Sequence, residues 1–181
     1  TRSDRDWSSD VCSSDLALKT SFPEIKYCNS NLLQHDIPCL IISVEKNRRG
    51  HIKELHEALS KLEMLNGIKM ILYVEHTVNA MDLPTALWRF CNNLDPKRDH
   101  YLNKKGIAGK YTAILGLDGT IKTKEWDGFE RDWPNIIVAD DKTIAAVDAK
   151  WEQLGIGKFI PSPSLKYKDQ MYGDKAVASL S

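Results

Sequence analysis

The sequence predicts an α/β fold in which helices cover a parallel or mixed β-sheet and an extended C-terminal tail follows. Two short, apolar, β-branched runs at residues 38–44 and 69–74 predict strands. Neither run alternates between polar and apolar residues, so both faces of each strand should be buried beneath helices. Amphipathic segments lie between the predicted strands. The expected order is strand, helix, strand, helix, strand, strand, helix.

The first helix is expected at residues 51–65, between these two strands. Turn-forming residues 47–50 precede it, and Asn66-Gly67 is a good stop signal. Its apolar positions recur at helical spacing and comprise Ile52, Leu55, Leu59 and Leu62. The charged residues Lys53, Glu57, Lys61 and Glu63 lie elsewhere, so one face of this helix should pack against the sheet.

The second helix should begin at Asp82, which can cap its first turn, and Pro84 is tolerated just inside. Its apolar face would consist of Leu83, Leu87 and Phe90. We expect the large ring of Trp88 to lie over the edge of the sheet or over the turn that follows the helix. A proline at residue 96 ends the helical pattern.

Two further strands are expected at residues 112–115 and 135–139, and a last helix at residues 141–154. The apolar face of that helix would consist of Ile144, Val147, Trp151 and Leu154. From residue 159 the chain changes character, because the prolines at 161 and 163 favour extended backbone. Residues 17–158 should therefore form one α/β domain. Residues 159–181 should form an extended tail that packs on a neighbouring domain or subunit.

Residues 1–16 resemble a translated sequencing adapter. They are rich in Ser and Asp and show no apolar periodicity, so they have little surface to bury. We expect them to be a non-native, disordered segment and exclude them from the argument about the fold.

Composition excludes several classes of protein. The 25 Lys and Arg residues balance 25 Asp and Glu residues, and no basic cluster marks a nucleic-acid surface. The apolar runs are far too short for a transmembrane segment. The four cysteines include no C-x-x-C pair, so they support neither a disulfide framework nor a zinc site. A reducing, cytoplasmic location is expected.

Polar motifs that could carry chemistry are sparse. The five histidines are scattered, and His51 and His56 lie five residues apart rather than four, so we expect solvated histidines and no metal site. The sequence contains neither a glycine-rich phosphate loop nor a G-x-S-x-G nucleophile motif. Residues 75–77 follow the second strand directly. They either line a ligand crevice at the carboxyl edge of the sheet or form a solvated loop.

The segment 116–122 reads Gly-Leu-Asp-Gly-Thr-Ile-Lys and follows a predicted strand. Its two glycines permit backbone conformations that other residues avoid, and Asp118 and Thr120 can bond to nearby backbone groups. These features fit a structural turn, and they also fit a mobile loop that faces a substrate. The sequence leaves both interpretations open.

Four segments resemble one enzyme family. They are residues 83–99, 116–122, 127–134 and 159–167. Together they resemble the C-terminal domain of the UbiD-type decarboxylases, most closely those associated with quinone biosynthesis, and the similarity extends over about residues 22–177. One departure is that residues 75–80 hold fewer carboxylates than family members often carry there.

The resemblance implies a function for the longer protein. Family members remove CO2 from aromatic or α,β-unsaturated acids, here a 4-hydroxybenzoate- or naphthoate-type quinone precursor. They use prenylated FMN together with a divalent metal such as Mn²⁺ and with K⁺. The catalytic, flavin-binding and metal-binding residues of the family lie in the preceding domain, and no position of this chain matches them.

The resemblance also implies the partners of this domain. They are the N-terminal and central domains of the same polypeptide, further copies in a homo-oligomer, and a small aromatic acid. The domain would provide oligomer contacts and a wall or lid of the active site. The candidate residues of its substrate-facing loop are Leu117, Asp118, Thr120 and Lys122. The alternative is a stand-alone, non-catalytic α/β binding or assembly module. A Rossmann-type oxidoreductase is disfavoured by the missing glycine fingerprint.

Overall fold

The computed structural model describes residues 16–107, 110–130, 136–171 and 177–178. The chain divides into two compact units, Thr1–Asp132 and Trp133–Ser181, and each is described by itself. This division precedes the segment predicted as the last helix, whereas the sequence suggested a boundary at residue 158. The proposed adapter segment, residues 1–16, lies outside the described residues except for Leu16.

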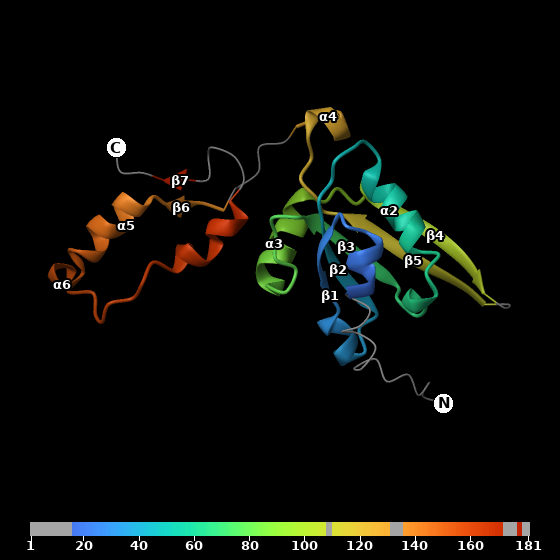
Figure 1. Ribbon diagram of the computed structural model, residues 1–181, viewed down its shortest axis with the longest axis horizontal. Helices are drawn as coiled ribbons and strands as arrows, with labels where there is room; N and C mark the ends of the chain where they lie inside the picture. The colour runs from blue at the N-terminus through green and yellow to red at the C-terminus, as the bar shows by residue number, and fades with distance from the viewer. Residues whose placement is uncertain (1–15, 108–109, 131–135, 172–176, 179–181) are drawn as a thin grey trace. The chain divides into compact units, whose positions relative to one another are not determined.

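A five-stranded mixed sheet forms the first unit, in the order β1-β2-β3-β5-β4 (Figure 1). The strands are β1 (Ile25–Asn29), β2 (Cys39–Val44), β3 (Met70–Glu75), β4 (His100–Ile107) and β5 (Lys110–Asp118). The three inner strands are parallel, since β3 pairs with β2 on one side and with β5 on the other. The two edge strands run antiparallel to their neighbours. The predicted α/β fold with a mixed sheet is therefore confirmed.

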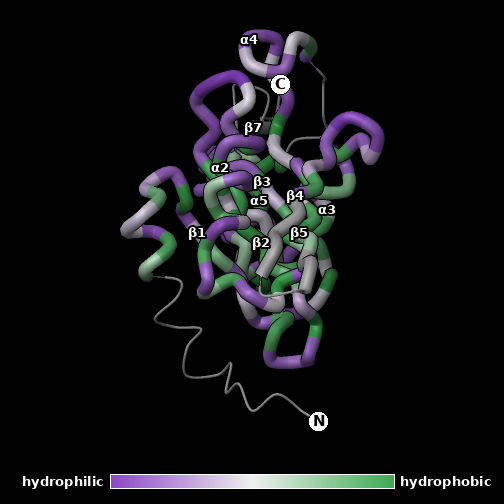
Figure 2. Tube along the Cα trace, turned by 90° about the vertical axis from the view of Figure 1, so that its right-hand side faces the viewer, coloured by the Kyte–Doolittle hydropathy of each residue, from purple (hydrophilic) through white to green (hydrophobic). Residues whose placement is uncertain are grey.

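Helices cover both faces of this sheet. Helix α2 (His51–Leu59) packs on one face and α3 (Leu83–Asn93) on the other (Figure 1). Alternate strand residues point to the two helices, so Ile42 and Tyr73 meet α2 while Ile41 and Leu72 meet α3. All six residues of β2 are buried, which explains its continuous apolar sequence (Figure 2).

The sequence interpretation missed both edge strands. β4 contains His, Asn and Lys among its residues and lacks an apolar run, and β1 is equally mixed. In β1, Lys26 and Tyr27 are exposed, so that strand lacks the continuous burial of the inner strands. The helix predicted at residues 51–65 also ends earlier than expected. α2 stops at Leu59, and the short 3₁₀ helix η2 (Glu63–Leu65) follows it. Another 3₁₀ helix, η1 (Asn31–His35), connects β1 and β2.

The predicted apolar face of α3 was only partly correct. Phe90 is buried, but Leu87 remains 38% exposed and Trp88 40% exposed. The buried positions of this helix are Thr85, Ala86, Arg89, Phe90 and Asn93. The helix is turned so that its two polar side chains, Arg89 and Asn93, reach buried partners at the sheet edge. Those polar contacts, which apolar periodicity does not register, determine the rotation of the helix.

The prediction of solvated histidines was wrong for two of the five. His51 and His56 are both buried on α2. His56 Nδ1 lies 2.8 Å from the Tyr73 hydroxyl and His56 Nε2 lies 3.1 Å from the Ile114 carbonyl oxygen. Both ring nitrogens therefore have partners, and a buried imidazole with satisfied nitrogens is compatible with a core position.

The second unit is small and contains a two-stranded sheet. β6 (Val138–Ala139) pairs in parallel with β7 (Val177–Ala178). The helix predicted at 141–154 forms two pieces, α5 (Asp141–Asp148) and α6 (Trp151–Leu154). The segment expected to be extended contains the 3₁₀ helix η3 (Pro163–Gln170). Across the part of the chain that the structure describes, no helix is both long and apolar enough to cross a membrane.

Candidate functional site

Two polar clusters, buried except for the exposed Arg98, lie at the carboxyl ends of the parallel strands β3 and β5. The first, the glutamate cluster, consists of Glu75, Arg89, Asn93 and Gly119. The Arg89 guanidinium donates to Glu75 Oε1, with Nε 2.5 Å from that oxygen. Asn93 Nδ2 donates to the Gly119 carbonyl oxygen at 3.1 Å and lies 3.4 Å from Glu75 Oε2. α3 is thereby fixed both to the end of β3 and to the turn after β5.

The second cluster, the aspartate cluster, consists of Arg98, Asp99, Asp118, Thr120 and Lys122. Lys122 Nζ lies 3.0 Å from Asp118 Oδ1 and 3.5 Å from Asp99 Oδ1, and it donates to the Asp118 carbonyl oxygen at 2.8 Å. The backbone N–H and the hydroxyl of Thr120 both donate to Asp118 Oδ1. Arg98 forms an ion pair with Asp99 at 2.6 Å. The buried charges therefore neutralise one another.

The ionisation of this cluster follows from its contacts. Burial alone would raise the pKa of the Asp99 carboxyl. Hydrogen bonds from Arg98 and from the backbone of Asp95, with the charge of Lys122, lower that pKa below its ordinary value instead. Burial and the carboxylates of Asp118 and Asp99 raise the pKa of the Tyr101 phenol. The cluster thus holds the Asp99 carboxylate beside the neutral phenol of Tyr101.

Two glycines allow the turn after β5 to lie against the core. A side chain on Gly116 would place its Cβ 2.6 Å from the His56 ring, and one on Gly119 would collide with Phe90. β5 therefore passes close to α2 at the first glycine, and the turn passes close to α3 at the second. Gly119 also donates its N–H to the Tyr73 carbonyl at 2.9 Å, which extends the pairing with β3. Close packing accounts for both glycines.

Three of the four segments that carry the family resemblance, residues 83–99, 116–122 and 127–134, contribute residues to this site. Lys46, just after β2, forms an ion pair with Asp127 at 2.8 Å and donates to the Ile121 carbonyl at 2.7 Å. Asp127 lies at the end of the short helix α4 (Lys124–Asp127). The Arg98 guanidinium lies 4.3 Å from the centre of the Phe129 ring, a cation–π contact. Residues far apart in sequence therefore assemble around one sheet edge.

The structure places the predicted loop residues within this assembly. Asp118, Thr120 and Lys122 are only 4%, 1% and 4% exposed, and their polar atoms bond to one another. Leu117 is half-buried in β5 and packs against the core cluster beneath α3. The structure brings these four residues together, and their role toward a substrate stays a prediction.

Several residues of the site were not singled out from the sequence. Lys46, Arg89 and Asn93 make contacts that hold the site together. In the sequence, only their positions relative to the predicted strand and helix could have pointed to them. Lys46 follows a buried strand, and the other two lie four residues apart on one face of α3. Glu75 was noted, and it is buried against Arg89 rather than in a solvated loop.

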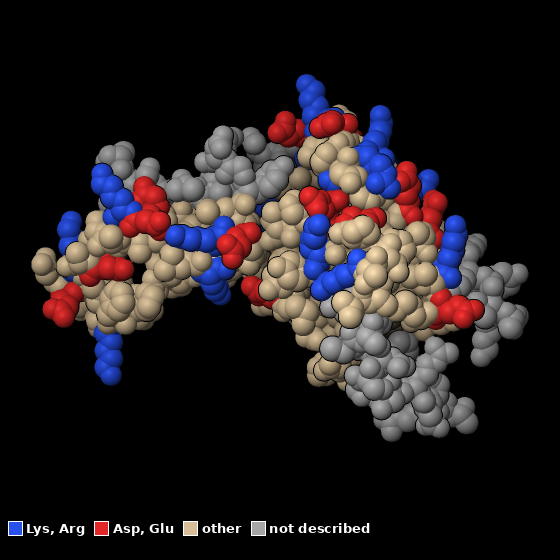
Figure 3. Space-filling model, in the orientation of Figure 1, with Lys and Arg blue, Asp and Glu red and all other residues tan. Residues whose placement is uncertain are grey.

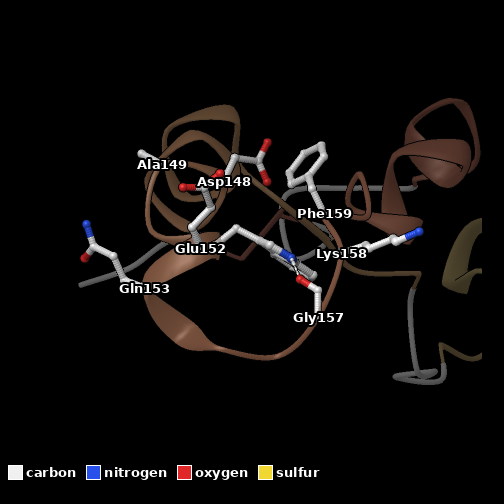
Figure 4. Close-up of a pocket in the computed structure, with 8 residues that line it drawn as sticks. Asp148, Ala149, Glu152, Gln153, Gly157, Lys158 and Phe159 are labelled. Carbon is white, nitrogen blue, oxygen red and sulfur yellow. Dashed lines mark hydrogen bonds between the residues drawn. The ribbon is translucent and has the colours of Figure 1, made fainter.

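A separate hollow of about 440 Å³ lies in the second unit (Figure 4). The Trp151 indole N–H donates to the Gly157 carbonyl at 3.1 Å. Asp148 and Glu152 line this hollow, and Lys158 extends away from them (Figure 4). No residue of α5 or α6 is buried, so the walls of this hollow are open to solvent.

The family model of the 3-octaprenyl-4-hydroxybenzoate carboxy-lyase C-terminal domain matches residues 13–113, more than half of the chain. The chain belongs to the UbiD C-terminal domain family. The match covers β1 to β4, α2 and α3, and it ends before the turn after β5.

Relatives of this UbiD domain are longer proteins. An uncharacterized protein of Aquifex aeolicus is 28% identical over 153 residues, which are 74% of this chain and 30% of the relative. One from Archaeoglobus fulgidus is 30% identical over 127 residues, 63% of this chain and 25% of the relative. The chain thus spans less than a third of the length of these curated relatives.

Solved structures share the fold of the UbiD domain. The Sedimentibacter hydroxybenzoicus vanillic acid decarboxylase in its closed form aligns with a TM-score of 0.57 at 16% identity, over 79% of this chain and 31% of that chain. The open form with truncated ShVdcD gives a TM-score of 0.55 at 18% identity, over 79% of this chain and 32% of that chain. At these identities the likeness concerns the fold.

The described residues of this UbiD domain do not suit a metal ion. They contain no group of three or more His, Cys, Asp or Glu side chains that could hold one. The buried carboxylates of Glu75, Asp99 and Asp118 are already paired with Arg or Lys side chains. A cation at this edge would have to displace those partners.

Proposed function

We propose that this domain is the C-terminal part of a UbiD-type decarboxylase. The longer polypeptide would remove CO2 non-oxidatively from an aromatic or α,β-unsaturated acid, such as a 4-hydroxybenzoate- or naphthoate-type quinone precursor. The observation that carries the proposal is the family match over residues 13–113. The three-fold greater length of the relatives supports it, because it leaves room for catalytic domains before this one.

The proposed contribution of this domain is a rigid wall of the active site together with contacts to other domains and subunits. Leu117, at the end of β5, would supply apolar contact to the substrate. Asp118, Thr120 and Lys122 would hold the turn in shape through the ion pairs and hydrogen bonds of the aspartate cluster. A preorganised wall excludes water from a closing site, which strengthens electrostatic interactions inside it.

The cofactors in this proposal belong to the preceding part of the polypeptide. Prenylated FMN, a divalent metal such as Mn²⁺, and K⁺ would bind there in a cytoplasmic, homo-oligomeric enzyme. Prenylated FMN would supply the electron sink for the carbanion-like character that develops as CO2 departs. The residues of this chain would shape and close the cleft.

The test begins with the reading frame upstream of residue 17. The complete polypeptide would be loaded with prenylated FMN, Mn²⁺ and K⁺ and incubated with hydroxybenzoate- and naphthoate-type acids, and CO2 release would be measured. We expect release from the complete polypeptide and none above background from the 181-residue chain. A genuine start codon near residue 17, or a complete polypeptide without a flavin-binding domain, would favour the stand-alone binding or assembly module instead.

The role of the turn has its own readout in the same enzyme. Leu117→Ala should change turnover or substrate preference while flavin binding and the unfolding midpoint stay unchanged. Loss of activity in proportion to loss of stability, with unchanged selectivity, would mean that the turn only supports the fold.

A further inference from the structure

The outer face of α3 lacks the charged side chains that solvent-facing helices normally carry. Its exposed positions recur at helical spacing and comprise Pro84, Leu87, Trp88 and Cys91, with Met81 just before the helix. We call these five residues the α3 stripe. The only charged residue within α3 is Arg89, and it is buried against Glu75.

α2 provides an internal comparison, because it packs on the opposite face of the same sheet. Its outward positions carry Lys53, Glu54 and Glu57, all exposed. Charged side chains gather over α2 and α4 at the upper right of Figure 3. An amphipathic helix that faces water follows the α2 pattern. The α3 stripe departs from it, and a contiguous exposed apolar surface of this kind marks an interaction site.

We propose that the α3 stripe is the surface on which the preceding domain of the same polypeptide docks. This inference rests on the proposed function, which places this chain at the C-terminal end of a longer enzyme. The proposed function requires a contact with the preceding domain, and this inference locates that contact on α3. Trp88, at 40% exposed, would be its anchor, because a large aromatic ring gives the most buried area per residue at an interface.

The size of the stripe favours a tethered neighbour over a second copy of the chain. Stable contacts between separate proteins bury about 800 Å² per partner. Five partly exposed side chains on and beside one eleven-residue helix fall short of that area. A domain joined through the chain has a high effective concentration, so a smaller contact suffices. The absence of charge on the stripe fits a lasting contact, since interface cores are depleted in charged residues.

Residues on the buried side of α3 connect the helix, and so any domain docked on it, to the candidate functional site. Arg89 and Asn93 connect the helix to Glu75 and to the Gly119 carbonyl. A domain that docks on the stripe would therefore be connected through one rigid helix to the turn at the end of β5. The α3 stripe lies on the outer side of this helix, and the residues that contact Glu75 and the turn lie on its buried side.

The experiment compares hydrogen–deuterium exchange of residues 83–93 in the 181-residue chain and in the complete polypeptide. Docking should slow exchange of these amides at least tenfold in the complete polypeptide. The double variant Leu87→Lys with Trp88→Glu, which adds no net charge, should abolish that difference. The matched control, Lys53→Glu with Glu57→Lys on α2, should leave it intact.

Several outcomes would overturn the inference. Equal exchange in both unsubstituted chains would mean that the preceding domain does not cover α3, and this comparison needs no variant to fold. Concentration-dependent dimerisation of the 181-residue chain that the double variant removes would identify a second copy as the occupant. The proposed function can fail independently of this inference. Slowed exchange without CO2 release would reject the decarboxylase and support docking on the α3 stripe. CO2 release with unchanged exchange would support the decarboxylase and reject the docking.

Discussion

Lys122 carries its ammonium group into an almost fully buried position, where two carboxylates and a backbone carbonyl surround it. Removing a charge from water is costly, and the cost is recovered only where the partners are well placed. Asp118 therefore depends on Lys122 for its counter-charge, whereas Asp99 has Arg98 as a second partner. The turn after β5 keeps its shape because Asp118 and Lys122 in the turn and Asp99 before β4 satisfy one another.

Lys122→Met should reduce the free energy of unfolding by about 3–5 kcal/mol, because it leaves two buried carboxylates without their shared cation. Chemical denaturation of the 181-residue chain measures this change. Lys53→Met, on the exposed side of α2, serves as the control and should cost less than about 0.5 kcal/mol. Similar effects from the two substitutions would show that the aspartate cluster adds no more than a surface charge.

His56 should make the stability of the domain sensitive to mild acid. Burial lowers the pKa of His56 below its ordinary value of 6.5. Below pH 6.5 the unfolded chain therefore binds a proton that the folded chain refuses, so stability falls as the pH drops from that value toward the folded pKa. His56→Gln should flatten this part of the pH profile of unfolding.

Asp99 affects the free energy of unfolding at lower pH than His56 does, so the two effects can be separated. The pKa of Asp99 falls below its ordinary value of 3.8, so its contribution is present above pH 3.8 and is lost only as the pH falls further. An unchanged profile between pH 6.5 and 4 in the His56 variant would assign that loss of stability to another group.

At the scale of elements, apolar patterning predicts inner strands better than helix rotations. β2 and β3 were placed within one residue because both faces of each strand are buried. α3 was found, but its rotation was wrong, since Arg89 and Asn93 turn inward to polar partners that lie 14 and 26 residues away in sequence. The edge strands were missed because single-sided pairing leaves no apolar run to detect.

The observed rotation of α3 leaves the Trp88 ring partly exposed, although the sequence suggested that it lies over the sheet edge or the following turn. Within the 181-residue chain, Trp88→Ala should change the unfolding midpoint little, because its ring is 40% exposed. Phe90→Ala, at a position only 6% exposed, should cost about 3–5 kcal/mol. Thermal unfolding of the two variants side by side checks this ranking. Equal decreases in the unfolding midpoint of the two variants would mean that Trp88 contributes to the core as much as Phe90 does.

At the scale of the whole molecule, the site could be predicted only in part. The turn at residues 116–122 and the segment near residue 99 were both noted from sequence, yet nothing in either indicated that Lys122 and Asp99 meet. Their contact depends on β4 and β5 forming a hairpin that returns residue 118 beside residue 99, where the Asp118 N–H donates to the Asp99 carbonyl at 2.8 Å. Contacts of this kind follow from topology, which residue spacing does not encode.

The place of β5 in the sheet has a consequence for synthesis on the ribosome. β5 is the last strand of the first unit to be made, yet it pairs between β3 and β4 rather than at an edge. Until residue 118 has left the exit tunnel, β3 presents an open backbone edge with Ile71, Leu72 and Val74 beside it. Unpaired apolar strands of nascent chains are prone to wrong pairing. We therefore expect the nascent domain to be most prone to wrong pairing while residues 76–118 are being made, before its central gap is filled.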